Sequence, residues 1–387
     1  MKFFHLSDLH LGRRIYEFSL IDDQKYILKE VLRRTDEEHP DAVVIAGDIY
    51  DRAVPSAEAV ELFDFFLTEL AGRHIPVLAI AGNHDSPERI AFGAGLMAPS
   101  GVYLSPVYNG RVEPVTLSDA YGEVRFYLLP FIKPANVRRF YPDAVIESYT
   151  DALRCAAEHM NIEPSTRNVL VTHQRVNILV AHQFVTGGVR SESEDITVGG
   201  TDNVDAAVFD GFDYVALGHL HGAQSIGRET LRYSGTPLKY SFSEKDQEKS
   251  ITVVELGEKG SVSISTLPLR PQRDMREVRG TYDELTLRRN YAGTNTDDYI
   301  HAVLTDENDI PNAFSRLQSI YPQLMKLDYD NRRTRTSVVI AAEERRRTMT
   351  DTELFAEFFE IQNGQKMTDK QSEYVKDVFA ALREEML

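Results

Sequence analysis

The sequence predicts an α/β fold in which strands and helices alternate. Three apolar runs typical of buried parallel strands lie at residues 3–6, 42–46 and 77–81, and two segments of helical periodicity separate them. A βαβαβ order of this kind predicts right-handed crossovers and a parallel sheet with helices on its faces. The 387 residues are enough for a full-sized enzyme domain and at least one smaller unit.

The two crossover helices are predicted over residues 19–38 and 56–72. In the first, apolar residues such as Ile27 and Val31 recur at helical spacing. The second has Ser56 as its start signal and ends at Gly72. Beyond these helices, we expect short strands at 102–104, 111–117, 124–129, 214–217, 231–233, 250–256 and 262–266, with a helix at 148–160.

The pattern changes again near residues 270–273, which we interpret as a linker. A small α+β domain is predicted beyond it, with strands at 299–304 and 337–341 and a helix at 313–320. Two amphipathic helices then close the chain, separated by Asn363 and Gly364. The predicted domains are therefore residues 1–270, 275–342 and 343–387.

Composition limits the classes of function. A formal net charge of −17 argues against a protein that holds nucleic acid by its overall field, although nucleic acid stays possible as a substrate. Local basic clusters such as Arg13-Arg14 are candidates for contact with a phosphate backbone. A single cysteine, Cys155, excludes an intrachain disulfide, and we find neither a signal-peptide pattern nor an apolar stretch of membrane-spanning length. These features predict a cytoplasmic protein.

Four short segments carry the chemistry, and each follows an apolar strand. They are Ser7-Asp8-Leu9-His10, Ala46-Gly47-Asp48-Ile49-Tyr50-Asp51, Ala81-Gly82-Asn83-His84-Asp85 and Leu217-Gly218-His219-Leu220-His221. Because the carboxyl ends of parallel strands face a common crevice, we expect these side chains to converge. Carboxylate, amide and imidazole groups are ligands for divalent metals, and two such ions close together form a clamp for phosphoryl transfer.

The roles within this set follow from its chemistry. The candidate metal ligands are Asp8, His10, Asp48, Asn83, His219, His221 and one further strand-end histidine. His84 is left beside a ligand, so we expect it to act as general acid or charge stabiliser for the leaving oxygen. Asp85 is expected to hydrogen-bond the His84 ring and set its tautomer.

The further histidine has two candidates, because the chain contains two strands ending in His-Gln. One copy runs from Asn168 to His173 and the other from Asn177 to His182. The residues alone leave both candidates open. Alanine replacement of His173 and of His182, with measurement of divalent-metal binding, distinguishes them.

Taken together, the four motifs resemble the signature of the calcineurin-like metallophosphoesterase superfamily. The chain is similar, over essentially its whole length, to the SbcD family of bacterial nuclease subunits, relatives of the archaeal and eukaryotic double-strand-break-repair nuclease. The added likeness lies in residues 182–187, 212–219 and 233–242. The family pattern has a single strand ending in His-Gln, and we prefer His182 to His173 because the segment Phe184-Val185-Thr186-Gly187 continues directly from it. This resemblance implies a β-sandwich flanked by helices, with a small α+β capping domain and a C-terminal helical hairpin.

The resemblance also implies a cofactor and an activity. Two Mn²⁺ ions are expected, the first held by Asp8, His10, Asp48 and His221 and the second by Asp48, Asn83, His182 and His219, with His84 catalytic. Mg²⁺ or another divalent ion is the open alternative. The family acts as an ATP-dependent 3′–5′ double-strand exonuclease and a hairpin or single-strand endonuclease in DNA repair, recombination and replication.

Partners are implied as well. Residues 275–342 are expected to meet DNA, and the terminal helices to bind the coiled coil of an SbcC-like ATPase in a heterotetramer built on a homodimer. The partner-binding candidates are Leu354, Phe355, Phe358, Phe359, Val375 and Phe379. Two rival functions stay open: a phosphatase or phosphodiesterase acting on a small molecule, and a scaffold whose site has decayed. DNA cleavage by the purified chain separates them.

Overall fold

The computed structural model describes residues 1–160, 176–194, 203–258, 261–332 and 334, a few positions between 352 and 359, and 367–385. The chain divides into two compact units. The first holds the described residues up to Met275, and the second holds those from Arg276 onward.

Two six-stranded sheets form the first unit. The first sheet has the order β14 (Val262–Pro268), β13 (Ser250–Leu256), β1 (Lys2–Leu6), β4 (Ala42–Ala46), β5 (Val77–Ile80), β6 (Val102–Leu104). The second has the order β11 (Gln224–Ile226), β12 (Arg228–Tyr233), β10 (Tyr214–Gly218), β9 (Val176–His182), β8 (Gly122–Leu128), β7 (Pro114–Asp119). Each sheet has a parallel centre and antiparallel strands at one or both of its edges.

An apolar core lies between these sheets. Phe3 of the first sheet meets Phe126 and Tyr214 of the second, with ring centroids 5.6 and 5.7 Å apart in edge-to-face contacts. Burying aromatic rings of this size contributes strongly to folding stability. The β-sandwich implied by the resemblance is confirmed. Periodicity alone predicted a parallel sheet, whereas the structure has two sheets that each contain parallel and antiparallel strands.

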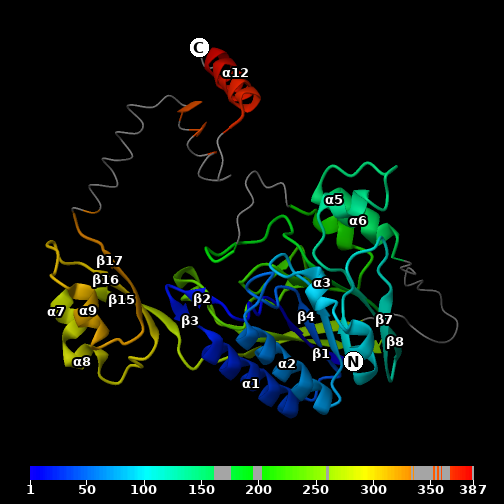
Figure 1. Ribbon diagram of the computed structural model, residues 1–387, viewed down its shortest axis with the longest axis horizontal. Helices are drawn as coiled ribbons and strands as arrows, with labels where there is room; N and C mark the ends of the chain where they lie inside the picture. Colours follow the sequence, from blue (N-terminus) through cyan, green and yellow to red (C-terminus); the bar gives the residue numbers. More distant parts are fainter. Residues whose placement is uncertain are drawn as a thin grey trace. The chain divides into compact units, whose positions relative to one another are not determined.

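Helices cover the outer faces of the sandwich. Helices α1 (Ile21–Glu38) and α2 (Ala57–Gly72) lie side by side over the first sheet (Figure 1). The Ser56 hydroxyl caps α2 by accepting from the Ala59 N–H at 3.3 Å, as the sequence predicts. On the second sheet, Val137 of α5 (Pro134–Arg138) and Leu153 of α6 (Tyr149–Glu158) pack against strand residues such as Leu179.

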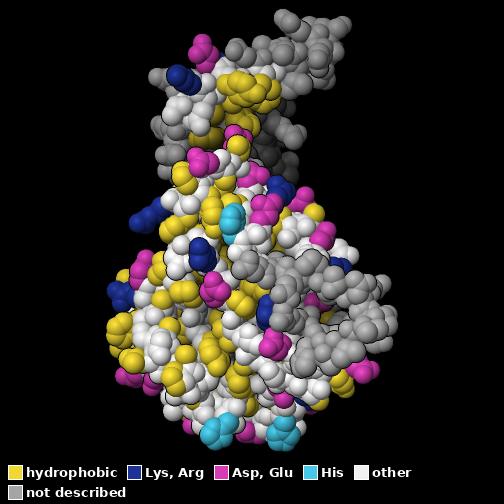
Figure 2. All heavy atoms as spheres, turned by 90° about the vertical axis from the view of Figure 1, so that its right-hand side faces the viewer, with side chains coloured by type: hydrophobic (Ala, Val, Ile, Leu, Met, Phe, Trp, Pro, Cys, Tyr) yellow, Lys and Arg dark blue, Asp and Glu magenta, His cyan; other side chains and the backbone are white. Residues whose placement is uncertain are grey.

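Shorter elements complete the first unit. They are the hairpin β2 (Arg14–Ile15) and β3 (Phe18–Ser19), the helices α3 (Pro87–Ile90) and α4 (Ala94–Met97), and the 3₁₀ turns η1 (Ala98–Ser100), η3 (Ala206–Phe209) and η4 (Phe242–Glu244). Over the described surface in Figure 2, acidic and basic side chains are interspersed among apolar ones.

From Arg276 onward, the second unit contains a three-stranded sheet of β15 (Met275–Gly280, whose first residue belongs to the first unit), β16 (Tyr299–Leu304) and β17 (Leu324–Tyr329). Its helices are α7 (Tyr282–Thr286), α8 (Arg288–Tyr291) and α9 (Ala313–Gln318). Ile300 and Leu304 of β16 pack on Leu317 of α9 in its core. The strand predicted at 299–304 occupies those residues. The strand predicted at 337–341 lies outside the described residues.

Helix α12 (Asp369–Glu385) provides most of the described part of the tail, and the Thr368 hydroxyl accepts from the Gln371 N–H at its start. The Phe355 and Phe379 rings meet with centroids 6.1 Å apart. Leu354 and Phe358 lie outside the described residues. Among the helices that the structure describes, none combines the length and apolar character needed to cross a membrane.

Candidate metal centre

The site forms where strands of both sheets end. Strands β1, β4 and β5 are parallel neighbours in one sheet, and β9 and β10 are parallel neighbours in the other. The ends of β9 and β4, which belong to different sheets, are in direct contact: the Nδ1 of His182 lies 2.8 Å from the Ala46 carbonyl oxygen. Residues predicted from four separate motifs therefore converge at one edge of the sandwich.

The backbone at these strand ends is strained. Asp8, His10, Asp48 and His219 all have positive φ values, of 53°, 43°, 48° and 107°. Such conformations cost on the order of 1–3 kcal/mol each and persist where the surroundings enforce them. Here the Asp8 N–H donates to the Gly47 carbonyl at 3.0 Å and the His10 N–H to the Asp48 carbonyl at 2.9 Å. The fold thus gives up stability to aim these side chains inward.

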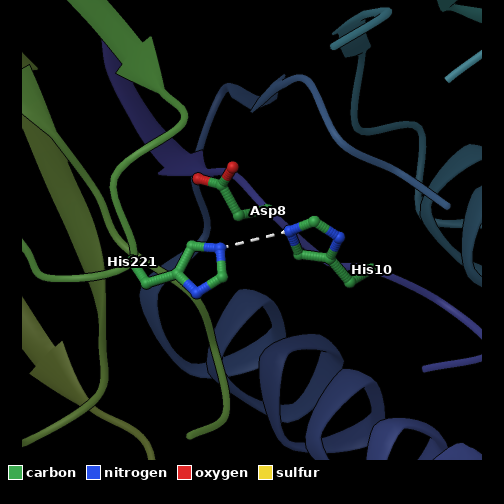
Figure 3. Close-up of side chains that lie close together, drawn as sticks. All are labelled: Asp8, His10 and His221. Atoms are coloured by element: carbon green, nitrogen blue, oxygen red, sulfur yellow. Dashed lines mark hydrogen bonds between the residues drawn. The ribbon is translucent and has the colours of Figure 1, made fainter. Parts of the chain in front are cut away.

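One group of ligands consists of Asp8, His10 and His221 (Figure 3). The two histidines point their Nε2 atoms at each other across 3.2 Å, with the Asp8 carboxylate beside them. All three side chains are buried. Two imidazole nitrogens and a carboxylate that face one small space are a donor set suited to a divalent cation.

Asp48 lies between this first group and a second group of candidate ligands, which contains Asn83, His182 and His219. Its Oδ2 lies 3.7 Å from His10 Nε2, 3.2 Å from His182 Nε2 and 4.0 Å from His84 Nε2. A carboxylate with imidazole nitrogens on two sides has the position that a bridging ligand needs.

The second group is completed by Asn83. Its Oδ1 lies 3.0 Å from His182 Nε2 and 3.1 Å from His219 Nδ1. An amide oxygen only accepts hydrogen bonds, so these nitrogens either carry protons or share a cation with it. His173, the alternative strand-end histidine, lies outside the described residues.

Two histidine tautomers follow from their backbone partners. His182 Nδ1 faces the Ala46 carbonyl, and His84 Nδ1 faces the Asp51 carbonyl at 3.1 Å. Carbonyls accept, so both Nδ1 atoms carry hydrogen and each neutral ring turns its Nε2 lone pair toward Asp48. Fixing the far nitrogen in this way is how proteins orient imidazoles toward metals.

The electrostatics of the site also fit a cation. Burial lowers the pKa of His10 well below its ordinary value and that of His219 to about 3. Burial, with the Asp48 charge, raises the pKa of Asp8 to about 8, whereas neighbouring His182 outweighs burial and holds the pKa of Asp48 well below its usual range. Among the described residues, His10 Nδ1 and His219 Nε2 are buried without a hydrogen-bond partner. A divalent ion would compensate carboxylates and lone pairs buried together.

Asp85 has a different place from the one expected. Its carboxylate accepts from the N–H groups of Ile49, Tyr50 and Gly82 at 3.0, 2.9 and 2.9 Å. The Asp85 carboxylate therefore connects the loop after β4 to the loop after β5. The Asp51 carbonyl, and not Asp85, faces the Nδ1 of His84. Gly82 is required in this arrangement, since a Cβ there would collide with the Asp48 carboxylate.

Several supporting residues were not predicted from the sequence. Gln24 of α1 donates to the His10 carbonyl at 2.7 Å and accepts from the Gly12 N–H at 2.9 Å, which holds the first motif in its strained form. The Tyr240 hydroxyl donates to the Leu9 carbonyl at 2.5 Å. Ser193, Glu244 and Lys249 lie behind His221. No spacing signal marks these residues, because each contact joins distant segments.

Comparisons with known proteins agree with this geometry. The family model "Calcineurin-like phosphoesterase" matches residues 1–223, and "Type 5 capsule protein repressor C-terminal domain" matches residues 271–363. The SbcD subunit of nuclease SbcCD from Staphylococcus epidermidis is 32% identical over 388 residues, covering 98% of each chain. The same subunit from Staphylococcus saprophyticus is 33% identical over 387 residues, covering 100% of this chain and 99% of that one.

Two solved structures overlap more loosely. The Thermus thermophilus protein TT1561 gives a TM-score of 0.35 at 11% identity, covering 68% of this chain and 98% of its own. A dimetal phosphatase from Danio rerio gives 0.36 at 10% identity, covering 70% and 96%. Neither overlap is close enough to add to the family assignment.

The fold and the cluster at its strand ends define a metal-dependent phosphodiesterase that uses a divalent ion. The two relatives at 32% and 33% identity match this chain over nearly its whole length, so the kind of phosphodiesterase can be stated more narrowly. The chain belongs to the SbcD family of SbcCD nuclease subunits, within the calcineurin-like phosphoesterases.

Proposed function

We propose that this chain is the Mn²⁺-dependent nuclease subunit of an SbcCD-type complex and cleaves phosphodiester bonds in DNA in the cytoplasm. The observation that carries the proposal is Asp48, whose Oδ2 lies within 3.7 Å of imidazole nitrogens from two different groups. A shared carboxylate at this position is what two-metal phosphoryl transfer requires.

In this proposal Asp8, His10, Asp48 and His221 hold the first ion, and Asp48, Asn83, His182 and His219 hold the second. A bound pair of divalent ions supplies activation of the attacking water and balances charge on the phosphodiester. The orientation of His182 by the Ala46 carbonyl supports its assignment over His173. Mn²⁺ is proposed from the family, since these ligands also suit Fe²⁺, Mg²⁺ and Zn²⁺.

His84 is the proposed general acid. The Asp51 carbonyl fixes its Nδ1–H, so a second proton would sit on Nε2, the atom nearest Asp48. Its side chain keeps 22% of its surface exposed, whereas that of Asp48 keeps 3%. His84 can therefore meet substrate from solvent and pass its Nε2 proton to the leaving oxygen.

For the remainder of the chain, the proposal follows the family resemblance. We propose that residues 275–342 contact DNA and that the tail from 343 binds the coiled coil of an SbcC-like ATPase in a heterotetramer. Phe355, Phe359, Val375 and Phe379 are the described candidates, and the Phe355–Phe379 contact supports a paired aromatic surface. The proposed activities are 3′–5′ double-strand exonuclease and hairpin or single-strand endonuclease, with roles in repair, recombination and replication.

A cleavage assay tests the proposal. Linear and hairpin DNA are incubated with the purified chain and Mn²⁺, with and without the ATPase partner, alongside a small phosphodiester such as bis-p-nitrophenyl phosphate. Cleavage of both DNA substrates, stimulated by partner and ATP, is the expected result. Hydrolysis of the small ester with intact DNA would instead establish a small-molecule phosphodiesterase, and no cleavage of either would indicate a decayed site.

A further inference from the structure

A buried ion pair lies behind His221, on the side of the ring away from His10. Glu244 is 0% exposed and Lys249 is 7% exposed. The Lys249 Nζ donates to Glu244 Oε2 at 2.5 Å, to the Gln247 side chain at 2.8 Å and to the His221 carbonyl at 2.9 Å. Lys249 therefore contacts the backbone of His221, a proposed metal ligand, and Glu244 contacts the ring of the same residue.

Glu244 Oε1 lies 3.4 Å from His221 Nδ1, and a path of shorter contacts joins the two through Ser193. The Ser193 Oγ lies 2.5 Å from Glu244 Oε1 and 2.6 Å from His221 Nδ1. With Lys249 2.5 Å away, Glu244 is a carboxylate and only accepts, so the hydroxyl hydrogen points to Glu244. The serine oxygen then accepts from His221, which places hydrogen on Nδ1 and the lone pair on Nε2, toward His10.

Three contacts hold Ser193 in this position. The Glu192 N–H donates to Ser243 Oγ at 3.1 Å, Gln247 Nε2 donates to Ser191 Oγ at 3.3 Å, and Arg13 Nη2 donates to the Ser193 carbonyl at 3.1 Å. The segment 191–193 is therefore attached at the serine and at the two residues before it, and two of these contacts join it to the loop that carries Glu244.

Stability alone is a weak reason for such a pair. The cost of removing two charges from water is often as large as their attraction, so buried ion pairs contribute little net stability. An arrangement that fixes the tautomer of a metal-binding imidazole has a direct use, and partners of this kind commonly change metal affinity about 10- to 100-fold.

We infer that Glu244 is a positioning residue for His221, acting through the Ser193 hydroxyl, and that it sets the affinity of the ion held beside Asp8 and His10. Glu244 touches neither substrate nor ion in this assignment. The inference rests on the proposed metal-dependent function, and it adds a residue outside the four motifs to the machinery of that site.

The test measures Mn²⁺ binding by calorimetry for the full chain and four variants. Glu244→Gln removes the carboxylate charge. Ser193→Ala removes the hydroxyl that links Glu244 to His221, and Ser193→Thr keeps a hydroxyl at that position. Asp298→Asn is the matched control, because it removes a buried carboxylate that binds Arg276 at 2.6 Å in the other unit. The His221 tautomer is read in the metal-free variants by ¹⁵N NMR of labelled histidine.

We expect one Mn²⁺ equivalent to bind about 10- to 100-fold more weakly in Glu244→Gln and several-fold more weakly in Ser193→Ala. Both variants should lose the pure Nδ1–H tautomer of His221. Ser193→Thr and Asp298→Asn should bind like the native chain. If Glu244→Gln fails to fold, the contrast between Ser193→Ala and Ser193→Thr decides.

Native affinity and an unchanged tautomer in Ser193→Ala, or in folded Glu244→Gln, would overturn the inference. A different outcome would overturn the proposed function instead: a native chain that binds no divalent ion and leaves DNA intact. Because binding is measured without DNA, the two failures are distinguishable.

Discussion

The two halves of the candidate centre are held in different ways. His182 is oriented by a main-chain carbonyl at 2.8 Å and sits against Gly47, where a Cβ would meet its ring. His221 is oriented by side chains, through Ser193 and the Glu244–Lys249 pair. A main-chain carbonyl is present whatever side chain residue 46 carries, whereas side-chain support can be altered one residue at a time. We therefore expect the His221 half to be the one that single substitutions can tune.

Replacing the carboxylate shared by both halves should have the largest effect. Asp48→Asn removes one negative charge from between the two groups, and loss of several kcal/mol of charge stabilisation corresponds to a fall in DNA cleavage on the order of 10³-fold or more. Calorimetry should show weakened Mn²⁺ binding at both sites. Loss at one site only would contradict the shared position of Asp48.

His84→Ala belongs to neither half and should separate chemistry from metal binding. Loss of a general acid costs about 10²- to 10⁴-fold, so cleavage should fall by that range while Mn²⁺ affinity stays within about twofold. His159→Ala is the matched control, since His159 lies on the Tyr141 ring outside the cluster. Full activity in His84→Ala would exclude it as the proton donor.

Gly47→Ala should disturb the half that depends on main-chain support. Gly47 has a φ of 87°, and the added methyl would press on His182 and on the Gly82 backbone. We expect a loss of about 1–3 kcal/mol in the free energy of unfolding and a weaker second Mn²⁺ equivalent. Gly72→Ala, where nothing lies within 4 Å, should be close to neutral. Equal behaviour of the two variants in denaturation and calorimetry would refute the packing argument.

The pH dependence of stability gives the smallest effect and sharpens the comparison. In the metal-free chain the pKa of Asp8 is raised to about 8 by burial and Asp48, and that of His182 to about 9, where Asp48 outweighs burial. Both values exceed those of the unfolded chain, 3.8 for Asp8 and 6.5 for His182, so the folded state holds extra protons and its stability falls as pH rises from these values toward the folded ones. The last part of this fall lies between about pH 7.5 and about pH 9. The loss should be on the order of 1–2 kcal/mol.

Mn²⁺ should abolish this slope, because ligands must be deprotonated to bind it. Chemical denaturation in chelator and in Mn²⁺ across that pH range measures both slopes. Parallel slopes would mean that the titrating groups do not share the metal site.

The candidate ligands could be predicted from sequence because they lie at or just after the ends of buried strands. Asp8, Asp48, Asn83 and His219 all come within three residues of an apolar run. Periodicity identifies such strands but does not say which sheet each one joins, so the division of the ligands between two sheets required the structure. Strands β15 and β17 were not predicted, since MREVRG and LMKLDY mix charges with apolar residues.

Support from distant residues was beyond sequence reasoning for a related reason. Ser193 and Glu244 are 51 residues apart, and their contact with His221 depends on tertiary packing alone. The role expected for Asp85 failed at short range: the turn after β5 directs its carboxylate to three backbone N–H groups. A side chain adjacent in sequence to the proposed catalytic histidine need not point toward its ring.

Anomalous diffraction from crystals soaked in Mn²⁺ tests the central claim most directly. The account predicts two peaks on either side of the Asp48 carboxylate, one bounded by Asp8, His10 and His221 and the other by Asn83, His182 and His219. A single peak remote from Asp48, or a second ion ligated by His173 in place of His182, would contradict it.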